Sequence, residues 1–205
     1  MNSVWTDGYT GWALYGTEQT ENATAIGNYL VSHGVNQTSA YAILGNMQHE
    51  SYLNPGQWEI GYNYDPNHGF GLGQWTPATK IENYLISQGI SPTQANMENY
   101  QYQLDFLLQD GGQWSTYFVD MNTGHSSYYN VTVPIYPTLQ DFLSDTTATL
   151  QEKTTSWMVY WERPNAGTAA LQSRIDYAEH WSGSHVITVA LIWLIAKVAQ
   201  AWRYK

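Results

Sequence analysis

Cysteine is absent from the 205 residues, which excludes disulfides, thiolate metal ligands and a cysteine nucleophile. Basic residues are scarce, with seven Lys and Arg against seventeen Asp and Glu. Nucleic-acid phosphates are bound by clustered Lys and Arg, so this acidic chain predicts no nucleic-acid partner. The six His show no HExxH or comparable spacing, and we therefore expect neither a metal nor another cofactor.

The N-terminal residues lack the basic and apolar regions of a secretory signal, so export, if it is needed, must come another way. Phenylalanine is rare as well, with four Phe against ten Trp and seventeen Tyr. Rings that carry a hydrogen-bonding group suit the mixed surface of a sugar, and they equally suit a Tyr- and Trp-rich core. Composition alone leaves both interpretations open.

The length of the chain fits one compact body with appendages rather than two full domains. Residues 1–20 are aperiodic and are predicted to form an arm, residues 21–183 the body, and residues 184–205 a hydrophobic C-terminal segment. All seventeen acidic residues precede Gly183, whereas three basic residues follow it. The body and the C-terminal segment therefore differ in the sign of their charge.

Apolar residues at helical spacing predict a mainly α fold with a small β region, in the α+β class. The predicted helices cover residues 22–34, 38–54, 78–88, 97–108, 138–143 and 147–161. Residues 55–76 are rich in Gly, Asn, Tyr and Pro, which favours loops with a small β-hairpin. Residues 113–136 carry aromatic and β-branched groups and are predicted to be extended.

Glu50 falls where an apolar side chain is expected. The helix that starts near residue 38 carries Ile43, Leu44 and Met47 on one face, and three residues further along that face lies Glu50. Burial and the negative end of the helix dipole both raise the pKa of such a carboxyl group, as a general acid near neutral pH requires. The alternative is a Glu that reaches solvent as the helix ends.

Glycine alternates with other residues from Gly69 to Trp75, so at three positions the backbone can approach a ligand closely or take a positive φ. No Lys-Ser or Lys-Thr pair follows, which argues against a phosphate loop. The segment is either an ordinary turn or a loop whose amides and Gln74 side chain line a sugar cleft, with Trp75 stacking on the sugar or closing the cleft.

A third segment, from Tyr160 to Pro164, has the pattern of a helix end with two large aromatic side chains. Proline cannot continue a helix, so the helix is expected to stop before Pro164. The adjacent charges of Glu162 and Arg163 fit best as solvated groups at that end.

Taken together, the segments Gly45 to Ser51, Gly69 to Thr76 and Tyr160 to Pro164 resemble the phage tail lysozyme family. That family is related more distantly to soluble lytic transglycosylases and goose-type lysozymes, whose motifs are a Glu-Ser pair, a Gly-Leu-x-Gln segment and a later helical Tyr. The match runs from Asn22 to Trp181 and keeps the order of the motifs. The resemblance implies a lysozyme-like fold and a glycosidase that cuts the β-1,4 bond between N-acetylmuramic acid and N-acetylglucosamine in peptidoglycan.

The same resemblance makes Glu50 the catalytic acid. It places the following residues at the substrate: Ser51, Gly71, Leu72, Gly73, Gln74, Trp75 and Tyr160. An inverting hydrolase also needs a second carboxylate about 6.5 to 9.5 Å away, and the candidates near the motifs are Asp65, Glu59 and Glu162. If none is placed correctly, the 6-hydroxyl of the substrate can attack instead, as in lytic transglycosylases. The family name favours hydrolysis.

The resemblance further implies a protein of the virion tail that opens the host cell wall for entry of the viral genome. The apolar run from Val186 to Ala196, which contains Thr188, is short for a spanning helix. For residues 184–205, docking to other tail proteins is favoured over a membrane segment, because the segment is flanked by aromatic residues and follows the expected enzyme domain. The rival interpretation is an inactive structural or sugar-binding tail protein. The presence of Glu50, Gln74 and Tyr160 argues against that rival, and the role of residues 111–137 stays open.

Overall fold

The computed structural model describes residues 16–62, 64–109 and 113–184, and it confirms the mainly α fold class. The helices are α1 (Thr17–Ser32), α2 (Gln37–Ser51), α3 (Thr79–Ser87), α4 (Gln94–Met97), α5 (Tyr100–Leu108), α6 (Leu139–Ser144), α7 (Leu150–Trp157) and α8 (Leu171–Gly183). α7 continues directly into a π-helical turn, η1 (Met158–Glu162), and a 3-10 turn, η2 (Ala166–Thr168), precedes α8. No helix in the described part of the chain is long and apolar enough to cross a membrane.

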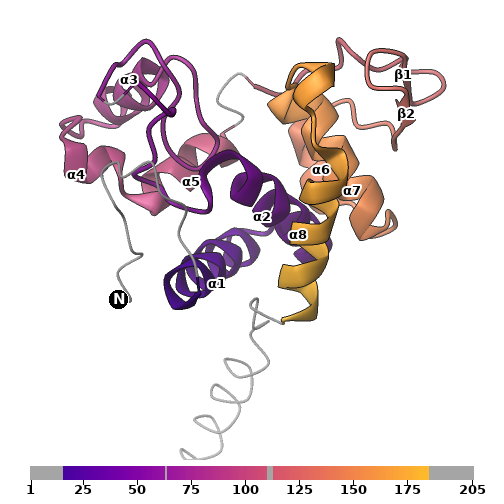
Figure 1. Ribbon diagram of the computed structural model, residues 1–205, viewed down its shortest axis with the longest axis horizontal. Coiled ribbons are helices and arrows are strands. Elements are labelled where there is room, and N and C mark those ends of the chain that lie inside the picture. Colours follow the sequence, from indigo (N-terminus) through magenta and orange to yellow (C-terminus); the bar gives the residue numbers. More distant parts are fainter. Residues whose placement is uncertain (1–15, 63, 110–112, 185–205) are drawn as a thin grey trace, which may run out of the picture.

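α2 is the central helix of the fold. Its residues from Ser39 to Gln48 are all buried, because α1, α6, α7 and α8 pack around it. Figure 1 shows α3, α4 and α5 on one side of α2, and α6, α7 and α8 on the other. We call these two sides the α3–α5 lobe and the α6–α8 lobe. The predicted single apolar face therefore underestimates the burial of α2, and Glu50 lies just beyond its fully buried stretch.

The ends of α2 follow from its sequence. At the start, the Asn36 side chain accepts a hydrogen bond from the Thr38 N–H group, which satisfies one of the free backbone donors of the first turn. At the end, Tyr52 and Leu53 both adopt left-handed conformations, with φ of 56° and 64°. Such φ values are uncommon for residues with a Cβ, and they turn the chain sharply away from the helix just after Glu50.

The α6–α8 lobe has an aromatic core. Trp114 stacks on Tyr160 with a ring separation of 4.8 Å, and Trp157 stacks on Trp161 at 4.7 Å. Phe142 contacts both Trp114 and Trp157. In this lobe the excess of Trp and Tyr therefore builds the core, which is one of the two interpretations that composition left open.

The small β region lies elsewhere than predicted. A two-stranded antiparallel sheet pairs β1 (His125–Ser126) with β2 (Val131–Thr132). Among the described residues of 55–76, where the hairpin was predicted, the pairing is limited to isolated bridges that join Phe70 to Trp58 and to Trp75. The prediction of a hairpin there was wrong, because successive tight turns interrupt any ladder longer than one residue pair.

The helices differ from the prediction in three further places. α1 begins at Thr17, inside the segment 1–20 that was predicted to be an arm. The predicted helix 97–108 is divided into α4 and α5, because Asn99 caps the start of α5 by accepting a hydrogen bond from Gln101 N–H. α8 was not predicted at all. The hydrophobic segment 184–205 lies, apart from Ser184, outside the described residues.

Gly45 allows α2 and α8 to approach each other closely. A Cβ atom at this position would lie 2.6 Å from the Arg174 carbonyl oxygen and 2.7 Å from the Ala178 Cβ. Both neighbours belong to the α8 helix, so the backbone of α8 would have to shift to make room. Glycine at this point therefore sets the distance between the two helices.

We predict that Gly45→Ala lowers the free energy of unfolding by about 1 to 3 kcal/mol, since overpacking a tight core forces backbone shifts. Urea unfolding measures the change. Gly183→Ala is the matched control, because a Cβ at Gly183 meets nothing within 4 Å, and it should leave stability within about 0.5 kcal/mol. Equal stability of the two variants would contradict the close packing of α2 on α8.

Candidate active site

Glu50 forms an ion pair with Arg174 of α8. The distance from Glu50 Oε1 to Arg174 Nη2 is 2.6 Å. The Arg174 side chain is 1% exposed and that of Glu50 is 21% exposed, so the cation is enclosed while the carboxylate keeps a path to solvent. A short charge-assisted hydrogen bond of this kind fixes the direction of the carboxyl group as well as compensating its charge.

Arg174 is itself held by two further hydrogen bonds. Its Nη1 donates to Asn46 Oδ1 at 3.0 Å, and its Nε donates to the Ala169 carbonyl at 2.9 Å. Asn46 in turn donates through Nδ2 to the carbonyl oxygens of Ala42 and Thr154. The orientation of Glu50 thus depends on a buried polar network that joins α2, α7 and α8.

Arg174 was missed by the sequence analysis. The signal that identified Glu50, a charged residue on the apolar face of a helix, is also present at Arg174. On α8 the buried residues are Arg174, Ala178 and Trp181, a helical stripe with a charge where an apolar residue is expected. Two opposite charges on the buried faces of two helices indicate a pair, because a buried charge needs a partner. The missing step was the prediction of α8.

An open cleft of about 510 Å³ lies beside Glu50. It is lined by Glu50, Glu59, Ile60, Gly69, Gln74 and Thr76. Two of the carboxylates named from the sequence, Glu50 and Glu59, therefore face the same space. Ile60 is 69% exposed on this wall, which offers an apolar surface next to the charged groups.

Glu59 is oriented by the glycine-rich segment. Its Oε2 accepts a hydrogen bond from the Gly69 N–H group at 2.9 Å and lies 3.3 Å from His68 Nδ1. The His68 ring stacks on Tyr62 with centroids 3.5 Å apart. Asp65 Oδ2 lies 3.7 Å from His68 Nε2, and Asp65 Oδ1 accepts a hydrogen bond from the Asn67 N–H group in an exposed turn.

The floor of the cleft is tied to the end of α2. The Ser51 hydroxyl donates to the carbonyl oxygens of Met47 and Leu72, both at 3.0 Å. The Gln74 side chain donates to the carbonyls of Gln57 and Gly71, which holds the turn in place. These bonds fix the position of the 71–74 loop relative to Glu50.

Gln103 of α5 is a further anchor that the sequence analysis did not find. Its Oε1 accepts from Leu72 N–H at 2.8 Å, and its Nε2 donates to the carbonyls of Pro55 and Met97 at 2.7 Å. A Cβ at Gly71 would lie 2.6 Å from Gln103 Oε1, and Gly71 has a φ of 77°. Both the close approach and the backbone conformation require glycine there.

Several residues assigned to the substrate by resemblance are buried in this structure. Leu72, Trp75 and Tyr160 are each 0% exposed. The Trp75 ring packs on Phe106, and the Gly73 backbone lies against the indole of Trp75. None of these three side chains lines the cleft, whereas Gln74 lines it directly.

Tyr160 lies in the aromatic core of the α6–α8 lobe. Its hydroxyl donates to the Pro134 carbonyl at 3.1 Å and accepts from Tyr136 N–H at 3.3 Å. Burial raises the pKa of Tyr160. The structure therefore brings Glu50, Glu59 and Gln74 together at the cleft, and it places the Tyr160 hydroxyl against the segment 134–136.

Glu162 is the remaining carboxylate near Glu50. It ends η1, and its Oε1 accepts a hydrogen bond from Trp157 Nε1 at 2.8 Å. Removal of the carboxyl group from solvent, followed by repulsion from Glu50, raises the pKa of Glu162 to about 8, although Arg174 opposes this shift. Glu162 is therefore a protonated, partly buried group at neutral pH, and the prediction of a solvated charge was wrong.

We find no group of His, Asp and Glu that could hold a metal ion among the described residues. His49, which precedes the candidate acid, has its pKa lowered by burial and by the positive charge of Arg174. It is thus neutral at neutral pH and leaves Arg174 as the cation that faces Glu50.

The raised pKa of Glu162 predicts a pH-dependent stability. As pH rises, the unfolded chain loses this proton first, so the stability that Glu162 contributes is present below about 4.5 and is lost toward about 8. Glu162→Gln keeps an acceptor for Trp157 and removes the titration. Chemical unfolding from acid to alkaline pH should show a smaller loss of stability in the variant. Parallel curves for both proteins would contradict a protonated Glu162.

Comparison with known proteins identifies the family. A sequence model of the phage tail lysozyme family matches residues 21–183. The chain is also similar to morphogenesis protein 1 of Bacillus phage B103, with 37% identity over 97 residues. That alignment covers 47% of this chain and 26% of the relative, so the matched region is about a quarter of the longer protein. Since the family model covers most of the sequence and contains Glu50, the cleft and Arg174, this chain belongs to the phage tail lysozyme family.

Proposed function

We propose that this chain is a glycosidase that cuts the β-1,4 bond between N-acetylmuramic acid and N-acetylglucosamine in peptidoglycan, with Glu50 as the general acid. The observation that carries the proposal is the position of Glu50, which faces an open cleft on one side and a buried guanidinium on the other. Membership of the phage tail lysozyme family supports the choice of substrate.

Glu162 lies close enough to Glu50 for their negative charges to repel each other, and this repulsion helps to raise the pKa of Glu162. Glu50 is the carboxyl group of the two that lines the cleft. It is therefore the one placed to give a proton to the glycosidic oxygen.

Glu59 is the best placed of the three candidates for the second carboxylate. It lines the same cleft as Glu50 and is oriented by Gly69 and His68. In an inverting mechanism this carboxylate would accept a proton from the attacking water while Glu50 protonates the leaving oxygen. Asp65 is turned toward Asn67 and His68, and Glu162 is engaged by Trp157.

The family and the similarity to a phage morphogenesis protein support a role in a phage particle. We infer that the enzyme acts from the virion tail and opens the host wall for genome entry. In this proposal residues 184–205 dock the enzyme to other tail proteins or contact the membrane.

We predict that Glu50→Gln lowers the release of fragments from purified peptidoglycan by at least about 100-fold, because the proton donor is lost. Mass spectrometry of the fragments gives both the amount and the chemistry of the new ends. Glu179→Gln, an exposed glutamate on α8 that pairs with Gln151, is the control and should keep full activity. Equal release by the Glu50→Gln and wild-type proteins would exclude Glu50 as the acid.

The same fragments test the role of Glu59. Reducing ends on N-acetylmuramic acid, together with a large loss of rate in Glu59→Gln, would support hydrolysis with Glu59 as the base. If 1,6-anhydro ends form and Glu59→Gln remains active, the substrate hydroxyl attacks and the enzyme is a lytic transglycosylase. If the wild-type protein binds peptidoglycan and releases nothing, it is a binding protein and the proposed function fails.

A further inference from the structure

The described part of the chain contains four Lys and Arg residues, and they divide into two kinds. Lys153 is buried and lies 3.1 Å from the Asp145 carboxylate. Arg174 is buried and lies 2.6 Å from the Glu50 carboxylate. Lys80 and Arg163 are half-buried, and neither forms an ion pair with a described carboxylate. In a protein with a net charge of −10, two unpaired cations require an explanation.

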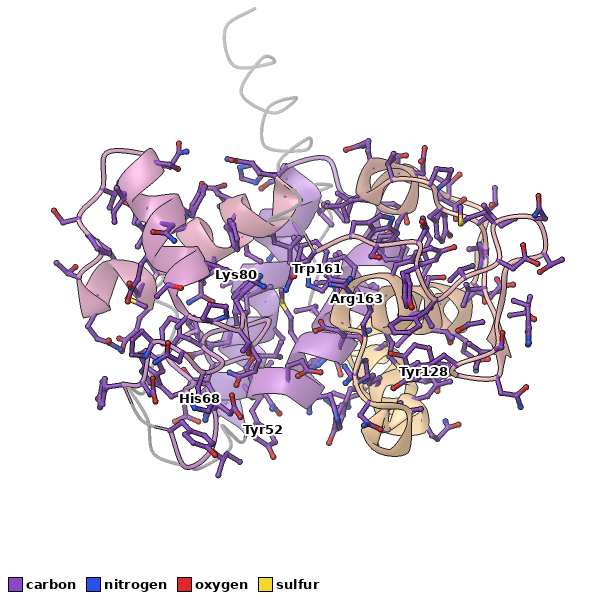
Figure 2. All side chains as sticks on the ribbon, turned by 90° about the horizontal axis from the view of Figure 1, so that it is seen from above. Tyr52, His68, Lys80, Tyr128, Trp161 and Arg163 are labelled. Carbon is purple, nitrogen blue, oxygen red and sulfur yellow. The ribbon has the colours of Figure 1, made fainter. Side chains whose placement is uncertain are left out.

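Lys80 and Arg163 come from different lobes. Lys80 is in the first turn of α3, and Arg163 follows η1. Figure 2 shows both in the middle of the molecule, with Lys80 on the side of the α3–α5 lobe and Arg163 on the side of the α6–α8 lobe. Burial and the positive charge of Arg163 both lower the pKa of Lys80. The two positive charges therefore repel each other. Two cations that repel each other across the lobes raise the energy of the protein without a ligand.

Their hydrogen-bond partners among the described residues are neutral. Lys80 Nζ donates to the Gln113 side-chain oxygen at 3.3 Å, and Arg163 Nε donates to the Trp161 carbonyl at 3.4 Å. Glu162 precedes Arg163 in the chain, but its pKa is raised to about 8, so it does not supply a full negative charge at neutral pH. The terminal nitrogens of Arg163 donate to no other described residue and remain available to an anion.

Arg163 also adopts a left-handed backbone conformation, with a φ of 49°. Its backbone N–H donates to the Met158 carbonyl and closes η1, and Pro164 follows. A side chain with a Cβ seldom takes this conformation, so the chain turns at a cost at Arg163.

We propose that Lys80 and Arg163 together form a binding site for a carboxylate carried by the glycan strand. Resting on the proposed function, the ligand is either the lactyl carboxylate of N-acetylmuramic acid or a carboxylate of its stem peptide. A guanidinium binds a carboxylate with two parallel hydrogen bonds, and an ammonium adds a point charge, so the pair suits one anion between them. Such a site would select peptidoglycan over uncharged polymers of N-acetylglucosamine.

The test compares three soluble glycans that differ in their anionic groups. They are chitin oligosaccharides without a carboxylate, peptide-free peptidoglycan oligosaccharides with the lactyl carboxylate, and oligosaccharides with intact stem peptides. Binding is measured by calorimetry in the Glu50→Gln background, which binds without cutting. Lys80→Gln and Arg163→Gln should each weaken binding of a carboxylate-bearing glycan about five- to tenfold and leave chitin binding unchanged.

Loss of affinity for the peptide-free glycan would assign the site to the lactyl carboxylate, and loss confined to the peptide-bearing glycan would assign it to the stem peptide. Gln140→Glu, on the exposed face of α6, changes the net charge by the same amount and should leave all three affinities unchanged. Lys80→Arg should retain binding.

Equal loss for all three glycans, or no loss for any, would overturn the proposal. These binding results do not depend on turnover. A wild-type protein that cuts nothing would therefore refute the proposed function while the anion site could still be judged.

Discussion

The ion pair between Glu50 and Arg174 is the interaction on which the site depends. It joins the end of α2 to the buried face of α8, and Asn46 extends it toward α7. A buried guanidinium without its carboxylate would be costly, so the fold and the orientation of Glu50 stabilise each other. The close contact of the two helices at Gly45 makes this possible, because the Arg174 backbone lies directly against α2.

The rest of the cleft is arranged around the same end of α2. Ser51 binds the Leu72 carbonyl, and Gln103 holds the loop from the opposite side. The loop then supplies Gln74 directly and orients Glu59 through the Gly69 N–H group. Glu50 is thus supported by the α6–α8 lobe, whereas Glu59 belongs to the α3–α5 lobe, and the cleft between them is where a glycan strand would lie. The chemistry therefore depends on how the two lobes are joined by α2.

Local sequence patterns predicted most of the helices and the position of Glu50, because helical periodicity and capping residues act within a few positions. The same patterns failed for residues 165–183, where a buried Arg replaces an apolar residue in the stripe of α8. They also could not separate Trp75 as a core residue from Trp75 as a sugar platform. Burial of a ring depends on which distant element covers it, here Phe106 of α5.

Electrostatic roles were the least predictable part. Glu162 was expected to be solvated, yet burial in the folded chain and the negative charge of Glu50 raise the pKa of its carboxyl group, against the opposing effect of the Trp157 hydrogen bond. The pKa of Glu162 depends on its distances to Glu50 of α2 and Arg174 of α8, which no local pattern contains. Charge on the buried face of a helix is nevertheless informative, since Arg174 and Lys153 of the described helices each have a carboxylate partner.

The most direct test of the account is the coupling energy between Glu50 and Arg174. A double-mutant cycle uses Glu50→Gln, Arg174→Met and the combined variant, each measured by urea unfolding. The contribution of the other hydrogen bonds of Arg174 to the free energy of unfolding cancels in this comparison. We predict a coupling of about 1 kcal/mol or more, with the second substitution costing less once the first is made. Additive effects within about 0.5 kcal/mol would show that the pair does not connect α2 to α8, and would contradict the account.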